Sequence, residues 1–189
     1  MAEEIVERRL AISGRDTESE ETADTLRQQG WIYDLRDDLD RAELAYLKSL
    51  EIYEKLNNKE GIAKDYSNIG AIYRKRGELG QAEKMHQKAL AIEDELGLQE
   101  GIAREYGNLG LISQMQGDLD RAEEMHQKAL AIEEKLGRQE GMARQYGNLG
   151  LIYLKQRELD RAEEVLQKAL AIEENLGHQE GMAIEYANI

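Results

Sequence analysis

A five-residue phrase returns along this chain at a constant interval of 40 residues, and this regularity restricts the fold more than any other feature. Tyr106–Gly110 reads Tyr-Gly-Asn-Leu-Gly, and Tyr146–Gly150 repeats it letter for letter. Tyr66–Gly70 carries the same phrase with Ser67 and Ile69 substituted. A period of about 20 to 50 residues indicates a stack of small units that bury their apolar faces against one another.

The same interval predicts how the chain is organised, as a single array over residues 1–189. We expect full repeats at 21–60, 61–100, 101–140 and 141–180. Residues 1–20 are expected to form the second helix of a degenerate earlier repeat and a loop, because Ala2–Val6 aligns with Ala162–Leu166. Residues 181–189 repeat the opening of a further unit. They predict either a piece of a longer array or a natural C-terminus that leaves an apolar face uncapped.

Each repeat has the pattern of two helices. In the repeat 101–140, apolar residues recur at the spacing of one helical face over roughly 99–116 and again over roughly 119–136. Gly117 and Gly137 are suited to the left-handed conformation that commonly ends a helix. The Asp118 carboxylate is placed to accept the first backbone N–H groups of the second helix. Two short loops therefore predict an antiparallel helical hairpin.

Composition restricts the function. The chain has a formal net charge of -14 and no cysteine, which excludes disulfides, thiolate metal sites and a cysteine nucleophile. The acidity argues against nucleic-acid binding, and no apolar run is long enough to predict a membrane span. His86 and His126 stand where other repeats have Tyr46 and Leu166, which indicates a packing position rather than a metal site. We expect a cytoplasmic protein that is not an enzyme and needs no metal or cofactor.

The repeat resembles a known family. Tyr106-x-x-Leu109-Gly110, followed by Ala122-x-x-x-His126-x-x-Ala129, is similar to the tetratricopeptide signature. The period of 40 and the absence of proline differ from the common form, and resemble the longer subtype of kinesin light chains and related cell-polarity scaffolds. The resemblance implies an all-α, right-handed superhelical solenoid of antiparallel helix pairs. It also implies a scaffold or adaptor for protein–protein interaction.

In the family, the first helices line a concave groove that binds extended peptides, and this chain has suitable residues at the groove positions. Basic residues and asparagines lie four apart, so each pair shares one helix face. A small residue lies between them, and a leucine follows. The predicted peptide-binding residues are Lys64, Asn68, Arg104, Gly107, Asn108, Leu111, Arg144, Gly147, Asn148 and Leu151. Arginine and asparagine chemistry predicts an extended, acidic peptide as the ligand.

Two alternatives stay open at this stage. In the first, the groove residues have a structural role: the asparagines bridge neighbouring helices, the arginines pair with Glu105 or Glu140, and the glycines serve packing. In the second, the chain is a self-association module. Uncapped terminal helices of two copies would then stack end to end and give homo-oligomers.

Overall fold

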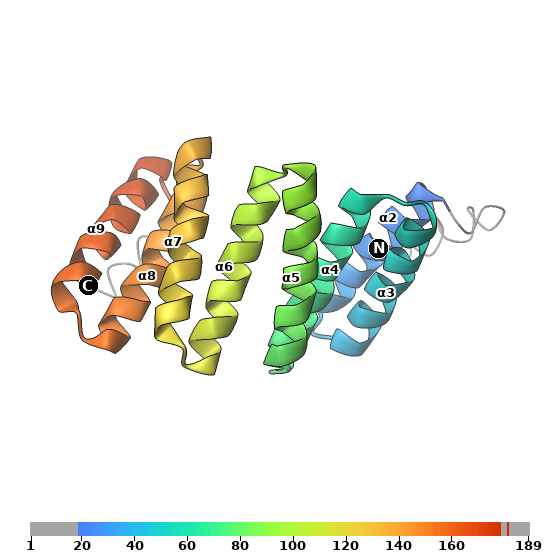
Figure 1. The fold of residues 1–189 in the computed structure, drawn as a ribbon, viewed down its shortest axis with the longest axis horizontal. Coiled ribbons are helices and arrows are strands. Elements are labelled where there is room, and N and C mark those ends of the chain that lie inside the picture. The colour runs from blue at the N-terminus through green and yellow to red at the C-terminus, as the bar shows by residue number, and fades with distance from the viewer. Residues whose placement is uncertain (1–18, 179–180, 182–189) are drawn as a thin grey trace. The chain divides into compact units, whose positions relative to one another are not determined.

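In the computed structural model, which describes residues 19–178 and 181, every regular element is a helix (Figure 1). The helices are α2 Glu20–Leu35, α3 Leu39–Lys55, α4 Lys59–Lys75, α5 Leu79–Leu96, α6 Gln99–Gln116, α7 Leu119–Leu136, α8 Gln139–Gln156 and α9 Leu159–Leu176. The predicted all-α repeat fold is confirmed. The expected earlier helix within 1–20 and the further repeat at 181–189 lie outside the described residues, apart from Ser19, Glu20 and Gly181.

The chain divides between Gly97 and Leu98 into two compact units. Helices α2 to α5 belong to the N-terminal unit, and helices α6 to α9 belong to the C-terminal unit. Each unit is two helical hairpins, and within each unit the second helix of one hairpin packs against the first helix of the next. That all of these repeats form one continuous array stays a prediction.

The helix boundaries follow from the residues expected to set them. The Asp118 carboxylate accepts a hydrogen bond from the backbone N–H of Arg121 at 3.1 Å, and α7 begins directly after it. Gly117 ends α6 with φ of 83°, a left-handed conformation that glycine adopts without steric cost. The expected limits 99–116 and 119–136 are those of α6 and α7.

The core of each unit lies along the seams between helices. In the C-terminal unit, Leu149, Ile152 and Tyr153 of α8 pack against the fully buried Ala122 of α7 and Ala162 of α9. In the N-terminal unit, Ile69 and Ile72 of α4 pack in the same way against α3. Alanine at the start of each second helix lets the hairpin close. One face of each first helix stays at least partly exposed, and the predicted basic residues and asparagines stand on it.

No helix among residues 19–178 combines the length and the apolar character that crossing a bilayer requires.

Candidate functional site

Most of the predicted site residues of the C-terminal unit line one depression between α6 and α8, with a volume of about 130 Å³. The arginines of the two helices stand at one repeat position, and the asparagines stand at another. The lining residues are Arg104, Gly107, Asn108 and Leu111 from α6, with Arg144, Gln145 and Asn148 from α8. The i, i+4 spacing places each arginine and the following asparagine on the same helix face. Six of the ten predicted residues are thus brought together.

The two arginines of the depression form ion pairs with buried carboxylates. Nε of Arg104 donates to Oε1 of Glu105 at 2.9 Å, and the Glu105 side chain is fully buried. Nη2 of Arg144 lies 3.6 Å from Oε1 of Glu133, which α7 contributes. Both arginine side chains nevertheless keep about half of their surface exposed, 46% for Arg104 and 58% for Arg144. Both arginine side chains therefore stay in contact with solvent beside the depression.

These contacts bear on the alternative that the arginines pair with Glu105 or Glu140, and they agree with it in part. The expected pairing of an arginine with Glu105 is present, at Arg104. Arg144 instead pairs with Glu133, a residue that the sequence reasoning did not consider. The pairs orient the arginines, and each guanidinium has five N–H donors in a fixed planar arrangement.

The two asparagines do not hold neighbouring helices together in the part of the chain that the structure describes. Asn108 and Asn148 are half-buried, and neither side chain has a hydrogen bond to another described residue. An asparagine amide offers both a donor and an acceptor. The proposed structural role of the asparagines as bridges therefore finds no support among residues 19–178 and 181.

Gln145 is part of the depression although the sequence reasoning missed it. Its side chain is only 1% exposed, and its Oε1 lies 2.9 Å from Nδ1 of the buried His126. Its amide also lies against Gly107, where an added Cβ would be 3.4 Å from Nε2. A side chain at position 107 would therefore lie in van der Waals contact with the Gln145 amide. The available signal was the repeat position itself, which carries Asp65 and Glu105 in other copies.

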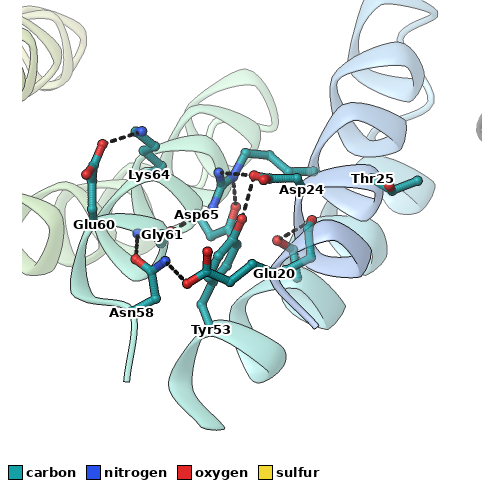
Figure 2. A network of polar contacts seen from close by, with 12 residues as sticks. Glu20, Asp24, Thr25, Tyr53, Asn58, Glu60, Gly61, Lys64 and Asp65 are labelled. Atoms are coloured by element: carbon teal, nitrogen blue, oxygen red, sulfur yellow. Dashed lines mark hydrogen bonds and ion pairs between the residues drawn. The ribbon is translucent and has the colours of Figure 1, made fainter. Parts of the chain in front are cut away.

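Four of the predicted residues lie elsewhere. Gly147 is buried within α8, and Leu151 is exposed further along the same helix; neither lines the depression. Lys64 and Asn68 belong to α4 of the N-terminal unit. There Nζ of Lys64 pairs with Oε1 of Glu60 at 2.6 Å, an exposed i, i+4 pair (Figure 2).

The equivalent place in the N-terminal unit is filled by an ion pair. Arg27 occupies the repeat position of Gly107, and Asp65 occupies the position of Gln145. Nε of Arg27 donates to Oδ1 of Asp65 at 2.7 Å, and its Nη2 donates to the carbonyl of Gly61 at 3.0 Å. Its guanidinium lies 4.5 Å from the ring centre of Tyr53, whose hydroxyl donates to Asp24 (Figure 2).

No metal site is evident in the described residues: residues 19–178 and 181 contain no group of three or more His, Cys, Asp or Glu side chains that could hold an ion. His126 is buried in packing, as its repeat position predicted.

Comparisons with known proteins agree with this architecture. A family model described as tetratricopeptide repeat matches residues 62–132 and, in a second overlapping match, residues 101–175. No curated protein sequence matches the chain.

Several solved structures have the same fold. BtubC (BKLC) from P. vanneervenii has a TM-score of 0.85 and 24% identity, over 99% of this chain and 78% of that one. A Podosopora anserina protein described as kinesin light chain with nearly identical TPR-like repeats has a TM-score of 0.70 and 18% identity, over 93% and 87%. A Rap protein complexed with Competence and Sporulation Factor has a TM-score of 0.82 and 20% identity, over 88% of this chain and 46% of that one. At these identities the likeness shows the fold.

Proposed function

This chain belongs to the tetratricopeptide repeat family, and from that premise we propose that the depression between α6 and α8 binds an extended, acidic peptide segment of a partner protein. The repeat fold is that of a protein-interaction scaffold. The proposal adds where the partner lies and which chemistry recognises it.

The observation that carries the proposal is the convergence of Arg104 and Arg144 with Asn108 and Asn148 around one depression. An arginine guanidinium binds a carboxylate through two parallel hydrogen bonds. An asparagine amide pairs with a peptide group in either direction, so two of them at a constant spacing suit an extended backbone. Leu111 adds an apolar contact at one end. The solved Rap protein complexed with Competence and Sporulation Factor offers an analogy for a bound partner in this fold.

The attraction for an acidic segment is local. The chain as a whole carries a net charge of -14, which repels an acidic partner at long range. Glu105 and Glu133 also offset part of the arginine charge nearby. Binding therefore depends on direct contact with the two guanidinium groups, and added salt weakens it.

The test is binding of an array of short synthetic peptides of varied acidity, with fluorescence anisotropy on the strongest binders. Reversing both arginines, as Arg104→Glu with Arg144→Glu, is expected to remove binding of acidic peptides. The matched control is Lys128→Glu with Lys168→Glu, which makes the same change of charge on α7 and α9, where each lysine forms an exposed pair with a glutamate. Equal binding by the arginine variant and the wild type would overturn the proposal, as would the absence of any acidic peptide among the binders.

Self-association stays the second candidate from the sequence. Light scattering over a range of protein concentrations separates the two functions, because a peptide-binding monomer keeps one mass and end-to-end stacking increases it.

A further inference from the structure

The floor of the depression presents a hydrogen-bond donor that the proposed function does not yet use. Gln145 lines the depression although its side chain is 99% buried. Its Oε1 is engaged by His126. Its Nε2 has no hydrogen-bond partner among the described residues. A donor that borders the depression can give its N–H to an acceptor atom of a ligand.

His126 determines which end of the amide remains for a ligand. Oε1 of Gln145 is only an acceptor, so the proton of the contact lies on Nδ1 of His126. The imidazole is fully buried, and its Nε2 has no hydrogen-bond partner among the described residues. The pair therefore engages the oxygen of the glutamine, and its nitrogen lies beside Gly107, 3.4 Å from where a Cβ would be.

The N-terminal unit has a different arrangement at the same repeat positions. There the side chain of Arg27 fills the space and donates to Asp65. In the C-terminal unit Gly107 has no side chain, and a glutamine replaces the aspartate. The arginine donor is thus absent, and the acceptor-only aspartate is replaced by an amide that can also donate. A complementary group at this point has to be an acceptor supplied from outside the chain.

We infer that Nε2 of Gln145 binds a carboxylate oxygen of an Asp or Glu side chain in the bound segment, which enters over Gly107 between Arg104 and Arg144. This inference rests on the proposed function and deepens it, because it assigns the residue that reads the acidic side chain. Gln145 contributes specificity by its type: a glutamate here, as at Glu105, would repel the same ligand.

The direct test compares the wild type with Gln145→Glu. The probes are the strongest acidic peptide from the array and its analogues with each Asp or Glu changed in turn to the amide. Glutamate occupies the equivalent buried position at 105, and thermal unfolding checks that the variant folds. We expect the acidic peptide to bind the variant about tenfold or more weakly, since a charge-assisted hydrogen bond is replaced by repulsion. For one of the amide analogues, the loss of affinity between the wild type and the variant should be much smaller.

A second variant, Gly107→Ala, leaves all charges in place. The added methyl group would lie 3.4 Å from Nε2 of Gln145 and cover it from the depression. Because alanine favours the helix, the fold is retained. Weaker peptide binding with unchanged or increased thermal stability is expected. Gly80→Ala is the control, since a Cβ there meets nothing within 4 Å.

The outcomes separate the two proposals. If acidic peptides bind the wild type and bind Gln145→Glu and Gly107→Ala equally well, the role of Gln145 is wrong while the proposed function stands. If no acidic peptide binds the wild type, both are wrong.

Discussion

A methyl group added to Gly110 would lie 2.6 Å from Nε2 of His126, closer than a Cβ approaches another heavy atom in folded proteins. The two residues face each other across the α6–α7 hairpin, and His126 is fully buried. The imidazole therefore occupies the space that the missing side chain leaves.

This contact predicts that Gly110→Ala destabilises the protein. The overpacked side chain should cost about 1–3 kcal/mol, which exceeds the gain of about 0.5–1 kcal/mol from the helix propensity of alanine. Chemical denaturation measures the difference. Gly80→Ala in α5, with no neighbour within 4 Å of its added Cβ, should be neutral or stabilising. Equal effects of the two substitutions would contradict the packing explanation.

The asparagines of the depression provide a test in which binding and stability are expected to separate. Asn108→Ala combined with Asn148→Ala should abolish binding of the acidic peptide. The free energy of unfolding should change by about 0.5 kcal/mol or less, because neither side chain is hydrogen-bonded to another described residue. Anisotropy and denaturation on the same sample check both parts. A large loss of stability would favour a structural role for the asparagines.

The pair of Arg27 and Asp65 predicts a large effect in the N-terminal unit. Arg27→Ala leaves the buried Asp65 carboxylate without its cation, a change that costs about 3–5 kcal/mol. The control is Arg41→Ala, which removes an exposed i, i+3 pair with Asp38 and should cost less than about 1 kcal/mol. Denaturant titration gives both values, and similar losses would show that burial of the pair is unimportant.

The helices could be predicted from the sequence because local signals determine them. Gly117 and Asp118 act through backbone conformation and one capping bond, so the limits of α6 and α7 follow from residues within a few positions. The shared face of Arg104 and Asn108 follows from helical spacing alone. These features could be predicted without knowing how the helices pack.

The remainder of the site depends on contacts between residues that are distant in the sequence. Arg144 reaches Glu133 of the preceding helix, and Gln145 reaches His126 across the α7–α8 interface. Gln145 stands at a position that packing buries, and the repeat pattern alone does not indicate that it also borders the depression. Comparison with Asp65 and Glu105 identifies Gln145 as a site residue only when the residues packed around it are known.

The loop after α8 predicts a stabilising change. Arg157 ends this helix with φ of 64°, whereas the equivalent Gly117 has φ of 83°. A left-handed conformation is costly for an arginine and not for glycine. Arg157→Gly should therefore stabilise the protein by about 0.5–1 kcal/mol, and Gly117→Arg should destabilise it by a similar amount. Thermal unfolding of the two variants should move in opposite directions, and a shift in the same direction would refute this account.

Replacing His126 should change how stability depends on pH. Burial lowers the pKa of His126 below its ordinary value of 6.5, and the nearby charge of Arg144 lowers it further, while the hydrogen bond to Gln145 opposes both. The unfolded chain therefore takes up a proton near pH 6.5 that the folded chain does not. This contribution to stability is present above that pH and is lost as the pH falls below it.

His126→Leu, which installs the residue found at the equivalent position 166, should remove that component. Unfolding free energies measured at a series of pH values should fall less steeply below pH 6.5 for the variant than for the wild type. Parallel curves for the two proteins would show that His126 is protonated equally in the folded and unfolded states. The variant also loses the contact that orients Gln145, so its preference for acidic peptides over their amide analogues should decrease.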